Sequence, residues 1–330
     1  MARPVIAILA LGGTIAAAPP EPGRAATMDR DADAIVRSVP ALAAAADVRP
    51  ESFRRTGSAD LGFADIVALA GRIDALADSV DGIVVTQGTD TLEETSFLLD
   101  RLVASDVPVV VTGAMRNAGL PGTDGPANLL AAVRVAASPL ARGIGTLVVM
   151  NDEIHLGRFV RKAHATSPAT FESRPLGPLG WVAEGHVRMP LVPRTRPRRF
   201  TLDTAEPVPQ VALVKMSLGD SPALIERIDR DTFAGAVIET YGAGHTSQRV
   251  LDALAGLAAR MPTVFASRAG AGEVHTSTCD FPGSELRLIE RGLVPAGALD
   301  GLKARLLLTL VLAGGLAGQD LRDEFTAAML

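Results

Sequence analysis

The chain has 330 residues, of which 48% are hydrophobic and 21% are charged, and its formal net charge is −5. This length and apolar content suit about two domains with large cores, so the composition excludes a disordered protein. The acidic balance provides no basic excess to displace counterions from phosphate, so we expect no nucleic-acid partner. Residues 306–316 are too few to span a bilayer and follow Arg305, so we expect no membrane partner either.

Short apolar segments alternate with stretches of helical periodicity along the chain. The segments do not alternate polar with apolar residues, which is typical of strands buried on both faces of a parallel sheet. Helices are predicted at 64–80 and 125–137. Strands are predicted at 5–11, 82–86, 108–113, 146–150, 211–216, 235–240 and 263–267.

This alternation breaks after Trp181, and residues 190–209 are rich in Pro and Arg without an apolar period. Such a stretch indicates a linker. The sequence therefore predicts an α/β protein with three parts. A larger N-terminal domain (1–190) has a mainly parallel sheet flanked by helices, and a linker (191–210) leads to a smaller C-terminal α/β domain (211–330).

The first apolar segment has two interpretations. A single Arg, an apolar run and small residues resemble a weak signal peptide, but the run is short and Gly12 and Gly13 interrupt it. We therefore predict a strand and a cytoplasmic location. Cys279 is the single cysteine, which fits a reducing compartment, and we interpret it as a spectator thiol. The histidines are scattered without metal-site spacing, so we predict no metal.

Candidate site residues follow three of the predicted strands. Thr14 follows a Gly-Gly turn, the segment 87–91 reads QGTDT, and Ala114 begins a third loop. Ligands of parallel sheets bind beyond the carboxyl ends of the strands, so these residues are candidates for a site. Thr91 and Glu94 fit a capping box at a helix start, which leaves Thr89 and Asp90 at the positive end of that helix.

A threonine hydroxyl is a weak nucleophile and needs an activating partner, which a lysine can supply. The chain offers Lys162, Lys215 and Lys303, and their spacing alone does not choose among them. Loop threonines also commonly cap helices or make turns, so a structural role for Thr14 and Thr89 stays open at this level.

The segments LALGGTIAA, VVTQGTDTLEET, VVTGAMR and TDGPANL, with KAR at 303–305, resemble the bacterial L-asparaginases and glutaminase-asparaginases over almost the whole chain. The resemblance implies hydrolysis of the side-chain amide of L-asparagine, and in some members L-glutamine, through a threonine acyl-enzyme. It also implies a homotetramer, built as a dimer of dimers, whose sites lie at a dimer interface to which the C-terminal domain contributes. No metal or organic cofactor is implied.

The resemblance also assigns roles to residues. Thr14 matches the nucleophile, and Thr89, Lys162 and Asp90 match a Thr-Lys-Asp triad. Further residues match positions that bind the substrate. They are Ser58 for the α-carboxylate, Asp90 for the α-amino group, the Ala114 backbone for the leaving amide, and Glu285, donated across the dimer.

Four positions depart from the family pattern. Ala25 stands at the place of a loop tyrosine, Ala59 replaces a glutamine, Gln87 replaces a histidine, and His245 replaces an asparagine. Ala59 and His245 are therefore candidate substrate contacts with altered chemistry. Two alternatives to an asparaginase stay open, namely a related amidohydrolase acting on another amide and an amino-acid binder that has lost the reaction.

Overall fold

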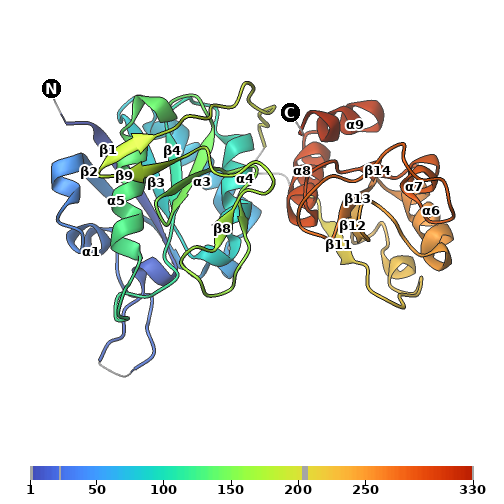
Figure 1. Ribbon diagram of the computed structural model, residues 1–330, viewed down its shortest axis with the longest axis horizontal. Helices are drawn as coiled ribbons and strands as arrows, with labels where there is room; N and C mark the ends of the chain where they lie inside the picture. The colour runs from blue at the N-terminus through green and yellow to red at the C-terminus, as the bar shows by residue number, and fades with distance from the viewer. Residues whose placement is uncertain (1–2, 22–23, 203–206, 329–330) are drawn as a thin grey trace. The chain divides into compact units, whose positions relative to one another are not determined.

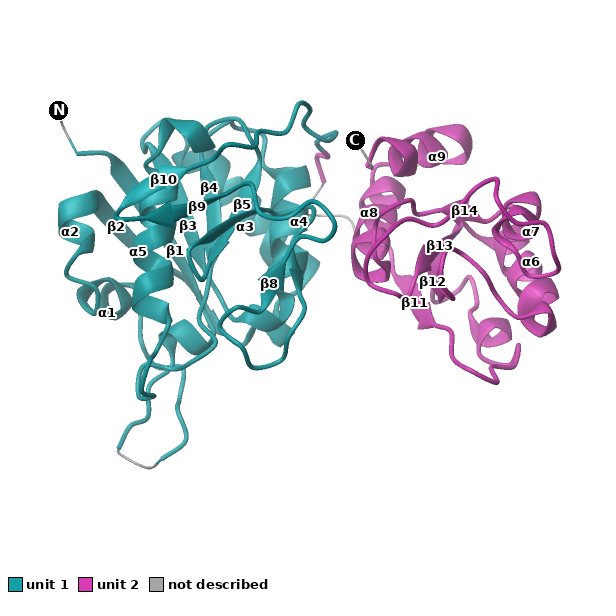
Figure 2. Cartoon of the chain, in the orientation of Figure 1, with its two compact units in different colours: residues 1–199 teal, residues 200–330 magenta. Residues whose placement is uncertain are grey.

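The structure is a computed structural model that describes residues 3–21, 24–202 and 207–328. The chain divides into two compact units, Met1–Arg199 and Phe200–Leu330 (Figure 2). Each unit has its own sheet, with helices on its faces. The predicted α/β class, with a larger mainly parallel domain and a smaller one, is confirmed.

Unit 1 is built on an eight-stranded sheet in the order β10-β9-β6-β5-β4-β3-β1-β2 (Figure 1). The strands from β5 to β2 run parallel, whereas β6, β9 and β10 pair antiparallel at the other edge. The strand bounds are β1 Val5–Gly12, β2 Asp47–Thr56, β3 Gly82–Thr86, β4 Val109–Thr112, β5 Thr146–Met150, β6 Glu153–Leu156, β9 Gly180–Ala183 and β10 His186–Arg188.

Helices bury both faces of the central strands. Helices α1 (Ala32–Arg37), α2 (Leu42–Ala45) and α5 (Gly125–Ala136) share one core with Ile6, Ile8 and Val84. Helices α3 (Phe63–Leu76) and α4 (Leu92–Leu102) pack against each other, and α4 contacts β4 and β5. Leu9 and Val85, which alternate with the first set along their strands, are also fully buried. Burial on both sides explains the uninterrupted apolar runs of these strands.

The basic run of the predicted linker is anchored to unit 1 by charge. Arg196 and Arg199 both pair with Asp106, at 2.8 and 2.7 Å. Their hydrogen bonds and charges lower the pKa of the Asp106 carboxyl, with Arg199 contributing most. The backbone carbonyl of Thr195 accepts a hydrogen bond from Arg158, whose guanidinium also reaches the buried Asp100. These contacts therefore hold residues 195–199, at the end of unit 1, against the rest of that unit.

Unit 2 has a four-stranded parallel sheet in the order β11-β12-β13-β14. Helix α8 (Gly301–Ala313) contacts β11, β12 and β13, and α6 (Leu251–Arg260) forms a separate core with Ile238 and Phe265. The remaining bounds are β11 Val211–Lys215, β12 Gly235–Thr240, β13 Thr263–Ser267, β14 Val294–Pro295, α7 Glu285–Glu290 and α9 Gly318–Ala327.

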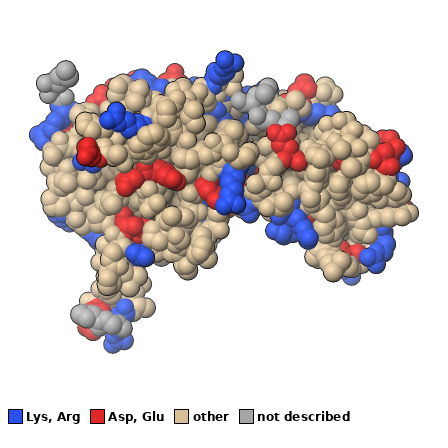
Figure 3. Space-filling model, in the orientation of Figure 1, with Lys and Arg blue, Asp and Glu red and all other residues tan. Residues whose placement is uncertain are grey.

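Charged side chains are mixed on the visible surface of both units. In Figure 3, basic and acidic side chains lie in small groups of either sign between larger areas of other residues. Within the described residues, none of the helices combines the length and apolar character needed to cross a bilayer.

Candidate active site

The loops after β1 and β3 meet at two glycines. Gly13 has φ +82°, and a Cβ placed on it would lie 2.1 Å from the backbone nitrogen of Gly88. Only glycine permits both this conformation and this approach. The contact brings the turn that carries Thr14 against the segment that carries Thr89, as expected for the carboxyl ends of adjacent parallel strands.

The loops after β2 and β4 close on the same segment. A Cβ on Gly88 would lie 2.8 Å from the Ser58 hydroxyl, and one on Gly113 would lie 2.6 Å from the carbonyl oxygen of Gln87. Ser58 is 3% exposed and begins a 3-10 turn, Ser58–Asp60. Four strand ends thus converge on the segment from Gln87 to Thr91.

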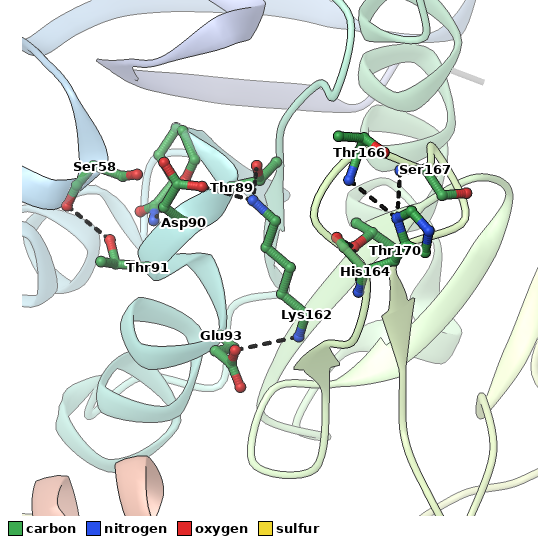
Figure 4. Close-up of polar contacts among 12 residues, drawn as sticks. Ser58, Thr89, Asp90, Thr91, Glu93, Lys162, His164, Thr166, Ser167 and Thr170 are labelled. Atoms are coloured by element: carbon green, nitrogen blue, oxygen red, sulfur yellow. Dashed lines mark hydrogen bonds and ion pairs between the residues drawn. The ribbon is translucent and has the colours of Figure 1, made fainter. Parts of the chain in front are cut away.

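The predicted capping box is wrong. Thr91 is the N-cap residue of α4 but makes no side-chain capping bond. Its hydroxyl donates instead to the backbone carbonyl of Ser58, at 2.8 Å (Figure 4). The turn Thr89–Thr91 is a 3-10 helix that runs into α4, and the N–H of Leu92 bonds back to Thr89. Thr91 therefore joins the loop after β2 to the loop after β3.

Lys162 joins Thr89 and Asp90 in one cluster. Its Nζ donates to Thr89 Oγ1 at 2.9 Å and to Asp90 Oδ1 at 2.6 Å (Figure 4). The lysine side chain is 13% exposed and that of Asp90 is 74% exposed, whereas Thr89 is buried. A lysine held this way can exchange a proton with the threonine hydroxyl when its amine is neutral. The structure thus brings together three of the four predicted catalytic side chains.

The backbone of Lys162 is fixed by a residue that the sequence did not single out. Lys162 lies on β7 (Arg161–Lys162), which pairs with β8 (Phe171–Glu172). Its N–H donates to the carboxylate of Glu93 in α4, at 3.2 Å, and Glu93 is 5% exposed. The segment 89–93 therefore contacts this lysine both at its backbone N–H and at its Nζ. The signal that the sequence offers is a glutamate four positions after Thr89, and its burial is seen in the structure.

The other two lysines have different surroundings. Lys215 is 61% exposed and lies 3.6 Å from Glu239 in unit 2. Lys303 is buried and pairs with Asp300 at the start of α8. Among the three candidates, Lys162 is the one whose ammonium contacts a threonine hydroxyl in the part of the chain that the structure describes.

Ala114 lies in a loop fixed by the start of α5. The Asp124 carboxylate accepts hydrogen bonds from the N–H groups of Met115 and Arg116, at 2.8 to 3.1 Å. The Asn128 side chain donates to the carbonyl of Gly113, at 3.0 Å. Ala114 is 1% exposed. Its backbone is therefore rigidly placed beside the convergence point.

The remaining predicted residues of unit 1 are more open. Thr14 is half-buried in the turn Thr14–Ala16, and its hydroxyl makes no hydrogen bond with any described residue. Ala59 is exposed beside Ser58, and Ala25 is exposed in the loop after β1. A methyl group at either position supplies neither a donor nor an acceptor.

Glu285 and His245 lie together in unit 2. Glu285 begins α7 and is fully buried, and its Oε1 accepts from the N–H groups of Thr278 and Cys279, at 2.9 and 2.6 Å. His245 Nε2 lies 3.4 Å from Glu285 Oε2, and the ring packs edge-on against Phe281. The ligand atoms of His245, Cys279 and Glu285 all lie within 4.8 Å of one another.

The charge of Glu285 is set by its surroundings. Burial alone would raise its pKa, but the N–H donors of Cys279, Glu285 itself and Thr278, with the nearby His245, outweigh it and leave the pKa lowered. The carboxylate is therefore negative at neutral pH, inside the unit.

Comparison with known proteins identifies the family. The model described as "Asparaginase, N-terminal" matches residues 5–193, and "Glutaminase/Asparaginase C-terminal domain" matches residues 210–325. The chain is 35% identical to L-asparaginase 2 of Escherichia coli, covering 98% of this chain and 93% of that protein. It is 35% identical to L-asparaginase 2 of Bacillus subtilis, covering 94% and 82%.

Further similarities extend to an enzyme with a second named activity and to a solved structure. The glutaminase-asparaginase of Pseudomonas fluorescens is 37% identical over 76% of this chain and 71% of its own. The crystal structure of a probable cytoplasmic L-asparaginase from Campylobacter jejuni superimposes with a TM-score of 0.87 at 30% identity, covering 98% of this chain and 100% of that one. The resemblance stated from the sequence is confirmed, and the chain belongs to the asparaginase family.

Proposed function

We propose that the protein hydrolyses the side-chain amide of L-asparagine to L-aspartate and ammonia through a threonine acyl-enzyme. The observation that carries the proposal is the cluster in which Lys162 contacts both Thr89 and Asp90. It supplies a threonine hydroxyl with a proton acceptor that is itself oriented by a carboxylate, as nucleophilic catalysis requires. Family membership and the names of the relatives support the same reaction.

In the first step, Thr14 Oγ1 attacks the amide carbon and ammonia leaves. The Thr14 hydroxyl makes no hydrogen bond with a described residue, so it needs to break none before it attacks. Its turn lies against Gly88, next to Thr89, which supports a role for the Thr89–Lys162 pair in taking the Thr14 proton and passing it to the departing nitrogen. The rigid backbone around Ala114 would hold the leaving amide.

In the second step, water attacks the acyl ester and aspartate leaves. Thr89 and Lys162 are suited to take the proton of this water and return it to Thr14 Oγ1 as the ester bond breaks, because their hydrogen bond already joins a hydroxyl to an amine. Asp90 has a second role. Its Oδ1 binds Lys162, while the side chain is 74% exposed and can accept the substrate α-ammonium on Oδ2. Ser58 would bind the α-carboxylate.

The proposal assigns Glu285 to a site shared between subunits. A buried carboxylate kept negative by backbone N–H groups suits a substrate ammonium. In the proposed homotetramer, a dimer of dimers, the partner's unit 2 contributes Glu285 and His245 to the site of unit 1. Light scattering during size-exclusion chromatography would test the tetramer.

Ammonia release from a panel of asparagine, glutamine and related amides tests the reaction. Thr14→Ala and Thr89→Val should each abolish hydrolysis while the tetramer persists. Lys162→Met should lower turnover by about 10²- to 10⁴-fold, the usual contribution of a general base. Lys215→Met is the matched control, because it removes an exposed lysine of unit 2 and should leave turnover unchanged. Turnover like that of the parent in either threonine variant would refute the catalytic role assigned to that threonine.

The acyl-enzyme itself needs a direct measurement. A rapid acid quench of the parent protein during turnover of asparagine should trap an aspartyl ester on Thr14, detectable by peptide mass spectrometry. The parallel Thr14→Ala sample should carry none. An ester on a different residue would reassign the nucleophile.

Ala25 and Ala59 favour a wider test of substrate. Both are exposed and lack the polar groups that many family members carry at these positions. If aspartate binds and none of the amides is turned over, the protein is an amino-acid binder. If only another amide is turned over, it is a related amidohydrolase. We also propose a cytoplasmic location, which cell fractionation would test.

A further inference from the structure

Three metal-ligand atoms meet in unit 2. A ring nitrogen of His245, Cys279 Sγ and a Glu285 carboxylate oxygen all lie within 4.8 Å of one another, although His245 precedes the other two by more than 30 residues. His245 Nε2 and Glu285 Oε2 are 3.4 Å apart. Two ligands of a tetrahedral zinc ion, each about 2.0–2.1 Å from the metal, lie about 3.4 Å apart. This pair therefore already has the spacing of two zinc ligands.

Two of the ligand atoms have no hydrogen-bond partner among the described residues. Glu285 is fully buried, and its Oε2 forms no hydrogen bond with any residue that the structure describes. His245 Nε2 is buried and equally without a hydrogen bond to the described residues, despite its distance from that oxygen. Buried polar atoms are rarely left this way, because losing water without a new bond costs about 1–3 kcal/mol each. The two atoms lie 3.4 Å apart without a hydrogen bond between them, as two ligands of one ion would.

The surrounding loops hold the three residues in place. The other Glu285 oxygen, Oε1, is taken up by the N–H groups of Thr278 and Cys279, which leaves Oε2 for a ligand. The turn that carries His245 is tied to the same region by the bond from Thr246 N to the carbonyl of Gly283, at 2.7 Å. A Cβ on Gly283 would lie 2.3 Å from the carbonyl oxygen of Thr246, so these two segments are closely packed.

We propose that His245 Nε2, Cys279 Sγ and Glu285 Oε2 form a site for a divalent transition-metal ion, with zinc as the best match. Thiolate and imidazole select zinc over magnesium or calcium, and a thiolate and a carboxylate balance its two charges. Binding forms a metal–sulfur bond and releases the Cys279 thiol proton to solvent. The His245 side chain is 31% exposed and Cys279 is half-buried, so the cluster lies near the surface of unit 2, and three residues leave the fourth position of a tetrahedral ion open.

Such a site would regulate the enzyme. This consequence rests on the proposed function, in which Glu285 binds the substrate ammonium. A metal ion on Glu285 Oε2 removes that negative charge and places a cation where the ammonium would bind. Zinc therefore inhibits hydrolysis, in competition with substrate, without taking part in the reaction.

Cobalt titration of the purified full-length protein tests binding independently of activity. One Co²⁺ per chain should bind with a sulfur-to-cobalt charge-transfer band, and Zn²⁺ should displace it. Zn²⁺ should also slow alkylation of Cys279, a clean readout because the chain has one cysteine. Cys279→Ser should abolish the band and weaken Zn²⁺ binding at least about 10-fold, as loss of a ligand should cost no less than loss of an outer-shell partner. His275→Gln, at an exposed histidine nearby, is the control and should leave both unchanged.

The activity measurement separates the two proposals. Cys279→Ser should keep parental hydrolysis in chelator but lose its sensitivity to Zn²⁺. Failure of the proposed function would show as no hydrolysis by the metal-free parent, whatever the cobalt spectrum. The site itself is refuted if the parent gives no sulfur-to-cobalt band, if Zn²⁺ does not protect Cys279, or if Cys279→Ser binds zinc as tightly as the parent.

Discussion

The contact between Gly13 and Gly88 gives a direct test of how the candidate site is assembled. In Gly13→Ala, the new Cβ would lie 2.1 Å from Gly88 N and 2.2 Å from Gly88 Cα, whereas ordinary contact begins near 3.4 Å. The two loops must therefore move apart by about 1.3 Å. A displacement of this size between reacting groups can cost about 10²-fold in rate. We expect a loss of about 100-fold in kcat/KM for asparagine.

The same substitution also strains the backbone, because φ is +82°. Gly143→Ala isolates that strain. Gly143 has φ +73° with nothing within 4 Å of its Cβ position, and it precedes β5, at the opposite end of the sheet from the site. Both variants should lose about 1–2 kcal/mol from the left-handed conformation, and Gly13→Ala a further 1–3 kcal/mol or so from overpacking.

Ammonia release and urea unfolding of both variants provide the assay. Gly143→Ala should be somewhat less stable but hydrolyse asparagine like the parent. Parental kcat/KM in Gly13→Ala would refute the reasoning, because the close approach would then not set the site. Equal losses of activity in both variants would attribute the effect to general destabilisation.

Three further predictions concern the surroundings of the site and the core. Glu93→Ala should lower kcat by about 10-fold or more in ammonia-release assays because Lys162 loses its backbone anchor, whereas Glu93→Gln keeps an acceptor oxygen and most of the activity. Asp100→Ala should lower the free energy of unfolding by about 3–5 kcal/mol in urea, because it strands the buried Arg158. Burial lowers the pKa of His155 from 6.5 to about 4, so on acidification the unfolded chain takes up this proton first. The free energy of unfolding should therefore be unaffected by His155 above pH 6.5 and should fall as the pH is lowered toward 4. Between these two pH values, urea unfolding of the parent should show a loss about 3 kcal/mol larger than that of His155→Gln. Parallel pH profiles of the two proteins would contradict this.

The central strands could be predicted because burial on both faces leaves a continuous apolar run. Residues 82–86, 146–150, 235–240 and 263–267 form strands with the predicted bounds. Strand β2 was missed because it lies at the sheet edge, where its exposure alternates and where Pro50 and charged side chains are tolerated. Strands β6, β9 and β10 were missed because they are short and lie at or near the antiparallel edge.

The side-chain contacts of the candidate active site could not be predicted from the sequence, for a different reason. Thr91 looked like a helix cap, but its hydroxyl bonds to Ser58, 33 residues away. Lys162 lies 73 residues from Thr89, and the β7–β8 pair and the bond from its N–H to Glu93 hold it there. Local spacing rules act within one or two turns of a helix, so they cannot choose between a local and a distant partner.

The candidate active site and the proposed metal site differ in how far sequence motifs indicate them. At the candidate active site, backbones approach so closely that a Cβ on Gly13, Gly88 or Gly113 would lie between 2.1 and 2.8 Å from a neighbouring atom. Glycine is then the one residue that fits, and the chain shows recognisable motifs there. The cluster of His245, Cys279 and Glu285 depends on where side chains end rather than on where backbones touch. Side-chain ends leave no glycine requirement at these positions, so the chain shows no comparable glycine motif there. Sequence motifs therefore locate the packed junction of the loops, whereas the meeting of Cys279 with His245 and Glu285 is seen in the three-dimensional structure.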